Sequence, residues 1–88
     1  MDEIYIGEVI HYYSNLKVAV VALEKDLSTG DIVHFKSPDS REAKVDFEQK
    51  VVSMEIEHQK IEAAEPSQEV ATKVDQRVRK KDRVYKKV

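Results

Sequence analysis

Three histidines are the side chains with the widest chemical range in this 88-residue chain, and they lie far apart as His11, His34 and His58. Zinc sites often take two histidines from one short motif such as HxxxH, and no such spacing occurs here. Each histidine falls in a different predicted strand, so a shared metal site would require three strands to converge. The sequence therefore predicts no metal site and places the histidines on the surface or at the rim of the fold.

Motifs for nucleophilic or nucleotide chemistry are absent from the sequence. The chain has no cysteine, and its two glycines, Gly7 and Gly30, form neither a phosphate loop nor a GxGxxG fingerprint. The serines lack the flanking residues of a nucleophile elbow. The acidic residues Glu55, Glu57 and Glu62 fit a solvated strand face better than a catalytic pair. We therefore expect a protein that is not an enzyme, with no cofactor and no nucleotide site.

Charge is distributed unevenly along the chain, although the formal net charge is only −2. Residues 1–72 carry seven Lys or Arg against fifteen Asp or Glu, whereas the basic C-terminal segment, residues 73–88, carries eight against two. Such a segment can form a contact surface for an anionic partner. The alternative is that the two oppositely charged parts attract each other or are solvated, and the sequence leaves both open.

Short strands are the elements that would position these side chains. Apolar, β-branched runs alternate with turn residues at spacings near a dozen residues, which is typical of a small closed β-barrel. We expect one all-β domain spanning residues 1–88. Its six predicted strands lie at 4–13, 17–23, 32–35, 44–59, 70–74 and 82–87.

Two of these strands contain predicted irregularities. Gly7 lies inside the first strand, where a glycine usually marks a bulge or a close backbone approach. In residues 44–59 the two-residue alternation changes phase at Val51-Val52, which predicts a bulge or a sharp bend. A helix is the alternative for residues 44–59, but their apolar residues give no clean stripe of period 3.6. Residues 61–68, which include Pro66, are predicted to form a loop with one helical turn.

Two seven-residue fragments of the chain echo each other. They are Leu27-Ser28-Thr29-Gly30-Asp31-Ile32-Val33 and Val78-Arg79-Lys80-Lys81-Asp82-Arg83-Val84. Gly30 can supply a positive φ angle in the first turn, and Asp31 can accept hydrogen bonds from nearby backbone amides. The echo predicts two related turn-and-strand units, of the kind found in small barrels that bind ligands.

Several segments together resemble a known barrel family. They are residues 6–13, 18–23, 27–33, 46–58 and 82–85. These segments resemble the second-domain barrel of translation GTPases such as elongation factor Tu, and freestanding translation elongation factor-like proteins. They are particularly similar to the small C-terminal barrel of collagenase-like peptidase homologues, some of which are linked to tRNA hydroxylation. The resemblance implies a six-stranded Greek-key barrel that docks to RNA, to a ribosome-associated partner or to another domain.

Two turns depart from the pattern of that family. Lys81 stands where the family usually has glycine, and Ala64-Glu65-Pro66-Ser67 replaces a loop that tends to have glycine near Ser67. We expect both turns to persist with altered backbone geometry. The GTPase domain is absent from this chain, so GTP hydrolysis cannot be transferred to it.

Two functional hypotheses follow from the sequence. The favoured one is docking to a protein partner, such as a peptidase-like or tRNA-modifying enzyme, with Gln49, Ser53 and His58 as a polar contact patch. The alternative is direct binding of tRNA or other RNA through basic side chains that contact phosphates and tyrosines that stack on bases. The residues proposed for RNA are Lys73, Arg77, Arg79, Lys80, Lys81, Arg83, Lys86, Lys87, Tyr12, Tyr13 and Tyr85.

The sequence also bears on the location of the protein. No apolar run approaches the roughly 18 residues that a membrane helix needs. The first residues, Met1 to Ile4, are acidic and lack the basic and apolar regions of a secretory signal. We expect a cytoplasmic protein that does not bind a membrane.

Overall fold

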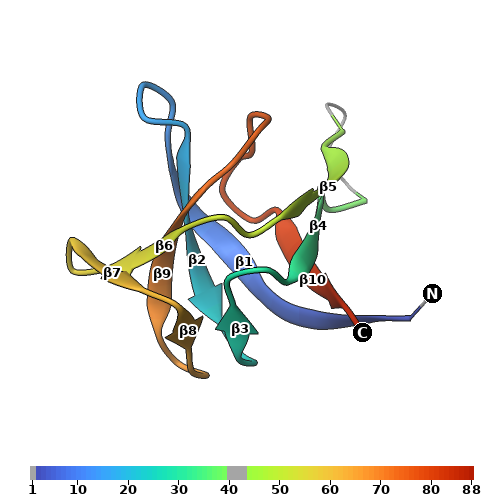
Figure 1. Cartoon of the computed structure of the whole chain (residues 1–88). Coiled ribbons are helices and arrows are strands. Elements are labelled where there is room, and N and C mark those ends of the chain that lie inside the picture. The colour runs from blue at the N-terminus through green and yellow to red at the C-terminus, as the bar shows by residue number, and fades with distance from the viewer. Residues whose placement is uncertain (1, 40–43) are drawn as a thin grey trace.

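The structure, a computed structural model, describes residues 2–39 and 44–88, and these residues form strands, turns and loops without a helix. The prediction of an all-β fold is confirmed (Figure 1). The ten strands are β1 (Glu3–Tyr13), β2 (Val18–Leu23), β3 (Leu27–Ser28), β4 (Ile32–Lys36), β5 (Asp46–Lys50), β6 (Met54–Ile56), β7 (Gln59–Ile61), β8 (Ala63–Ala64), β9 (Glu69–Lys73) and β10 (Arg83–Lys87).

Eight of these strands form one antiparallel sheet in the order β5-β4-β10-β1-β2-β9-β6-β7, and β3 pairs separately with β8. No pairing between described residues joins the two edges of the large sheet, so the predicted closed six-stranded Greek-key barrel is not confirmed. The chain itself connects the two sides of the sheet, because the edge strand β5 leads across residues 51–53 into β6, which lies beside the other edge strand, β7. The helical turn predicted within residues 61–68 is wrong, since Ala63–Ala64 is extended and pairs with β3.

The predicted irregularity at Val51-Val52 is a bend between β5 and β6. The side chain of Val51 is buried at 1% exposure, whereas that of Val52 is 68% exposed. The strand therefore changes the side that it presents to the core at this point, as the phase change of the sequence indicates. Because of this bend, the same stretch of chain pairs with two strands: its first part, β5, pairs with β4, and its second part, β6, pairs with β9.

Side chains make the hydrogen bonds that are missing from the ladder beside this bend. The Gln49 side chain is buried at 7% exposure, donates from Nε2 to the Lys73 carbonyl at 2.8 Å and accepts from the Asp75 backbone N–H at 2.8 Å. Nearby, the Thr72 hydroxyl donates to the Ser53 carbonyl at 2.8 Å. The amide of Gln49 therefore connects β5 to the end of β9, where no backbone pairing exists between them.

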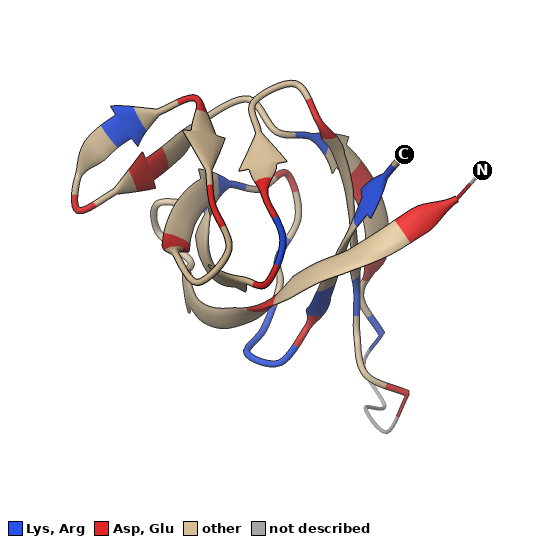
Figure 2. Ribbon diagram, turned by 90° about the horizontal axis from the view of Figure 1, so that it is seen from below, with Lys and Arg blue, Asp and Glu red and all other residues tan. Residues whose placement is uncertain are grey.

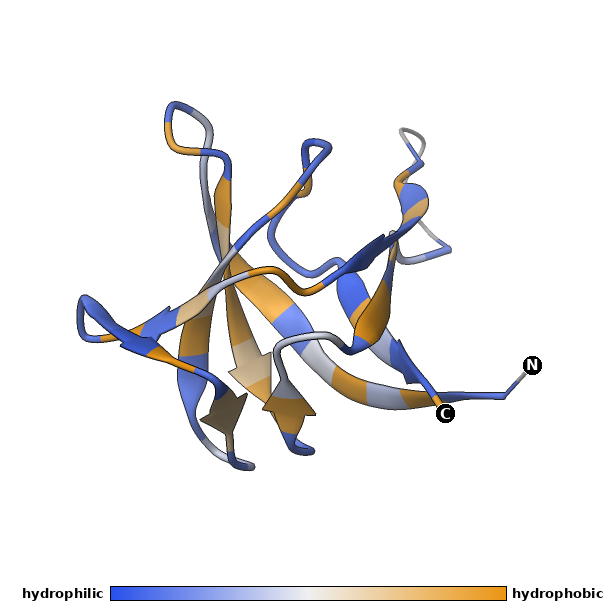
Figure 3. Ribbon diagram, viewed as in Figure 1, coloured by the Kyte–Doolittle hydropathy of each residue, from blue (hydrophilic) through white to orange (hydrophobic). Residues whose placement is uncertain are grey.

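The core takes alternate residues from strands such as β2, β4, β5 and β9. Figure 3 shows hydrophobic segments in most of the strands of the curled sheet. Phe35 and Phe47, which face each other across β4 and β5, stack with ring centroids 5.1 Å apart. The other buried apolar residues are Ile6, Val9, Ala19, Val21, Leu23, Leu27, Val33, Val51, Met54, Ala64, Val70, Val74, Val78 and Val84.

Gly7 allows two strands to approach closely, as predicted. A Cβ atom at this position would lie 2.2 Å from the Ala22 carbonyl oxygen of β2, which is a severe steric clash. The pairing of β1 with β10 also shifts register between Tyr5 and Gly7. Glycine is therefore required here by the contact with β2, and it coincides with a bulge in β1.

The two echoing fragments fold as equivalent turns. In the first, the Ser28 backbone N–H donates to Asp31 Oδ2 at 2.9 Å, and in the second the Arg79 N–H donates to Asp82 Oδ2 at 2.8 Å. The turns also bond to equivalent partners, because each exchanges two backbone hydrogen bonds of 2.8 Å with one buried valine. The valine is Val51 for Gly30 and Asp31, and Val9 for Lys81 and Asp82.

The two departures from the family pattern do not alter the turns as expected. Lys81 has a φ of 76°, close to the 95° of Gly30 at the equivalent position, and Ser67 has a φ of 73°. Both residues adopt the left-handed conformation that glycine favours, which costs a residue with a Cβ atom about 1 kcal/mol. The turns therefore keep a glycine-like backbone geometry at the expense of local strain.

We expect Gln49→Leu to lower the free energy of unfolding by about 2 kcal/mol, because it leaves the Lys73 carbonyl and the Asp75 N–H without their partner. Urea denaturation monitored by circular dichroism measures the change. Gln59→Leu, at an exposed position of β7, is the control and should have little effect. Equal stability of the two variants would show that the Gln49 amide does not hold β5 to β9.

Candidate functional site

The basic C-terminal segment does not form one free surface. On β10, Lys86 Nζ lies 3.7 Å from Asp26 Oδ1, and Lys87 Nζ lies 2.8 Å from Glu48 Oε2. The hydrogen bond to Glu48 is the main cause of the raised pKa of Lys87. Both ammonium groups are thus already matched by carboxylates, which makes them poor contacts for phosphate.

All the remaining basic side chains of this segment except Lys73 lie between β9 and the start of β10, in residues 77–83, which we call the basic loop. Arg77, Arg79, Lys80 and Lys81 are exposed in this loop, and Arg83 is exposed at the start of β10, opposite Lys36 of β4. Lys73 is exposed at the end of β9. In Figure 2 this loop is blue and is separated from the hairpin of β6 and β7, which has a red tip.

Two of the three tyrosines proposed for base stacking are occupied by internal packing. Tyr12 packs against the core. Tyr85 lies edge-on to Tyr5, with ring centroids 5.7 Å apart, and 6.2 Å from the ring of His34. Tyr13 differs, because it is 49% exposed and makes an edge contact with His11 at 4.3 Å.

The predicted polar patch of Gln49, Ser53 and His58 does not exist as a common surface. Gln49 is buried, with both ends of its amide bonded to backbone atoms. Ser53 lines one surface cavity, which has a volume of about 530 Å³, and His58 lines another. The prediction failed at Gln49 because its burial depends on the bend that brings β5 beside the end of β9.

A network of charges around His34 was not identified from the sequence. Nδ1 of His34 lies 2.9 Å from Glu3 Oε2, and Nε2 contacts Asp46. Lys87 extends the network, lying 3.7 Å from Glu3 and 2.8 Å from Glu48. The residues belong to β1, β4, β5 and β10, so only the strand order and register bring them together.

Protonation of His34 is favoured by this network. Partial burial lowers the pKa of His34, but the hydrogen bonds to Asp46 and Glu3 outweigh this effect and raise the pKa above its ordinary value of 6.5. The same contact with His34 lowers the pKa of Asp46. Glu3, His34 and Glu48 could each offer an atom to a metal ion, yet Lys87 already lies within 4 Å of both glutamates. We therefore interpret this cluster as a structural network that holds β1, β4, β5 and β10 together.

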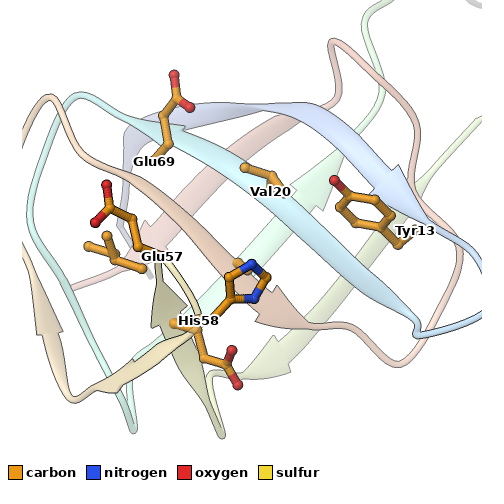
Figure 4. Close-up of a pocket in the computed structure, with 8 residues that line it drawn as sticks. Tyr13, Val20, Glu57, His58 and Glu69 are labelled. Atoms are coloured by element: carbon orange, nitrogen blue, oxygen red, sulfur yellow. The ribbon is translucent and has the colours of Figure 1, made fainter.

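A cavity of about 440 Å³ on the outer face of the sheet combines exposed acidic and apolar groups (Figure 4). Val20 of β2 and Ala71 of β9 face each other across the strands and are half-buried, and Glu55 of β6 is the next residue in the same row. We call this cavity the acidic groove. It is lined by Tyr13, Val20, Glu55, Ile56, Glu57, His58, Glu69 and Ala71.

Three carboxylates of the acidic groove have no partner among the side chains that the structure describes. Glu55, Glu57 and Glu69 come from β6, the β6–β7 turn and β9, and all three are exposed. None of them makes an ion pair or a side-chain hydrogen bond with another described residue. Negative charge is therefore available here for an external group, in contrast to the compensated carboxylates around His34.

The rim of the acidic groove has an unusual backbone. Glu57 and His58 form the two-residue turn between β6 and β7, with φ angles of 51° and 66°. A hairpin turn with two positive φ angles normally contains asparagine, aspartate or glycine. The turn therefore holds two larger side chains at the rim, each in a conformation that costs about 1 kcal/mol.

Comparison with known proteins relates the chain to domains of peptidases. Over 83 residues it is 34% identical to an uncharacterized protease of Methanocaldococcus jannaschii, a match that covers 94% of this chain and 19% of the protease. The crystal structure of the C-terminal domain of a putative U32 peptidase from Geobacillus thermoleovorans matches with a TM-score of 0.82 and 24% identity, over 96% of this chain and 92% of that one. This chain has the fold of that domain.

A second crystal structure agrees with the first. The selenomethionine variant of the same Geobacillus domain matches with a TM-score of 0.80 and 24% identity, over 91% of this chain and 95% of that one. No family model matches the chain. The comparisons thus support the resemblance to the C-terminal domain of a collagenase-like (U32) peptidase and do not confirm the resemblance to the barrel of elongation factor Tu. Among the described residues, no helix is long and apolar enough to cross a membrane.

We expect the free energy of unfolding to fall as the pH rises from about 6.5 through the raised pKa of folded His34. The folded protein binds this proton more tightly than the unfolded chain, so the stabilisation is complete below the unfolded pKa and is lost at higher pH. Denaturant titrations between pH 5.5 and 8.5 measure it. His34→Gln should remove this pH dependence and His58→Gln should keep it. An unchanged slope in His34→Gln would contradict the assignment.

Proposed function

We propose that this chain is a non-catalytic docking module for a protein partner of the peptidase-like or tRNA-modifying class. The observation that carries the proposal is the acidic groove, where three exposed carboxylates, unpaired within residues 2–39 and 44–88, surround an apolar floor on a sheet. A surface of this kind suits recognition by charge and shape complementarity. The relation to a U32 peptidase domain points to an enzyme as the partner.

The interior of the domain supports a role in binding. Among the described residues, every buried side-chain nitrogen or oxygen has a hydrogen-bond partner. The described serine hydroxyls that form hydrogen bonds contact backbone atoms: Ser37 Oγ accepts from Val45 N–H, and Ser67 Oγ donates to the Pro66 carbonyl. Catalysis usually needs a nucleophile within reach of a base, and we assign no such pair in the part of the chain that the structure describes.

The curvature of the sheet also supports the proposal. We interpret the curled sheet as a six-stranded barrel of the translation-factor type, in which the bent segment β5–β6 pairs with β4 on one side and with β9 on the other. The side chains of Gln49 and Thr72 then form hydrogen bonds between strands where a continuous backbone ladder would otherwise form them. Barrels of this size are filled by side chains, which leaves the outer face and the loops for contacts with partners.

We expect the tagged chain, cross-linked in its native cells and then purified, to retain one peptidase-like or tRNA-modifying protein in a stoichiometric amount. Quantitative mass spectrometry identifies the partner, and size-exclusion chromatography of the purified pair measures the stoichiometry. The tag alone is the control. Recovery of the chain by itself, with a monomeric elution volume, would count against a docking module.

Direct binding of tRNA is the second candidate function, and the basic loop favours it. Arg77, Arg79, Lys81 and Arg83 are exposed and form no ion pair with a carboxylate among the described residues. Cations that neutralise phosphates gain affinity by releasing counterions. Against this candidate, Lys86 and Lys87 are already paired, and packing occupies Tyr12 and Tyr85.

If the basic loop binds RNA, fluorescence anisotropy of labelled bulk tRNA should show micromolar affinity that weakens several-fold with added salt. Reversal of three charges, Arg79→Glu, Lys81→Glu and Arg83→Glu, should then abolish binding. The matched control reverses three exposed lysines outside the loop, Lys25→Glu, Lys50→Glu and Lys60→Glu. No binding at low salt, or equal binding by both triple variants, would eliminate this candidate.

A further inference from the structure

We propose that the acidic groove binds an extended basic segment of a partner protein, with an arginine or lysine side chain lying across its floor. The inference rests on the proposed docking function and names the chemistry of the partner. It follows from three features of the groove: its apolar floor, its three carboxylates that pair with no described side chain, and its exposed aromatic ring.

The floor of the groove suits the stem of a long basic side chain. Val20 and Ala71 are adjacent in the sheet and half-buried, and Ile56, which also lines the groove, packs against the core. Lysine and arginine cover apolar surface with their methylene groups while the charged end stays accessible to polar groups. A volume of about 440 Å³ is within the usual range for a ligand-binding cleft.

The carboxylates of the groove supply the attraction for the charged end. Glu55, Glu57 and Glu69 approach the groove from three different elements, so a cation within it meets negative charge on several sides. Lys60 lies opposite Glu55 in the β6–β7 pair and forms no ion pair with it. A guanidinium group can bind a carboxylate with two parallel hydrogen bonds, which favours arginine over lysine.

The ring of Tyr13 adds a contact that neutral or acidic segments cannot use. Its half-exposed ring lines the groove and is supported by the edge contact with His11. Cations are attracted to the face of an aromatic ring within about 6 Å of its centroid. Phosphate groups would be repelled by the same carboxylates, so the groove selects a basic peptide and rejects nucleic acid.

The probe is a fluorescein-labelled nine-residue peptide of alternating valine and arginine, titrated into ¹⁵N-labelled full chain at low and moderate salt. Anisotropy measures the dissociation constant, and amide chemical shifts locate the site. We expect saturable binding with the largest shifts at Tyr13, Ile56, His58 and Ala71. The same peptide with glutamate in place of arginine should not bind.

Removal of two groove charges, Glu55→Gln with Glu69→Gln, should weaken binding of the arginine peptide about tenfold, at up to about 1 kcal/mol for each exposed ion pair. The matched control, Glu24→Gln with Glu65→Gln, removes two exposed charges outside the groove and should bind like the unaltered chain. Folding of each variant is checked by its amide spectrum.

Three results would overturn this inference. They are shifts centred on another surface, equal affinity of the two double variants, and concentration-dependent shifts without peptide, which would show that a second copy fills the groove with its basic loop. The proposed docking function is tested separately. A cross-linked partner whose capture survives Glu55→Gln with Glu69→Gln would refute the groove as its site and leave the docking function standing.

Discussion

The side-chain amide of Gln49 joins β5 to the end of β9 where the described residues of these two strands form no backbone ladder. β5 pairs with β4, β6 pairs with β9, and the three residues between them must turn from one neighbour to the other. By donating to Lys73 and accepting from Asp75, the amide compensates for the interrupted ladder with two hydrogen bonds in a buried position. The acidic groove depends on this arrangement, since Glu55 of β6 comes to lie beside Ala71 of β9 only after the chain has bent.

One of the two equivalent turns stabilises the bend at Val51, and the other stabilises β1 at Val9 in the same way. Each turn exchanges a pair of backbone hydrogen bonds with a buried valine in a bent strand, Val9 in β1 or Val51 after β5. Asp31 and Asp82 fix the turns by accepting an N–H three residues earlier. The repeated geometry explains why Lys81 keeps a positive φ angle: the hydrogen bonds to Val9 require it.

Sequence patterns that act locally were sufficient to predict much of the fold. The phase change at Val51-Val52 predicted the bend, and Gly7 predicted a close approach to a neighbouring strand. The pairing of Ala63–Ala64 with β3 was missed, because two small residues beside a proline carry no strand signal. The charges around His34 and the acidic groove were also missed, because both arise from strand order and register, which a single sequence does not specify. Gln49 was assigned to the surface, since polar residues are usually exposed.

The first and last described residues, Asp2 and Val88, are joined by a backbone hydrogen bond of 3.1 Å at the open end of the β1–β10 pair (Figure 1). In this geometry, tension applied between these two positions acts on one end of an antiparallel ladder. It would separate the strands one rung at a time, starting with Glu3 and Lys87, and would not shear all the rungs together. Tension applied at these two positions would therefore be borne by one rung of the ladder at a time.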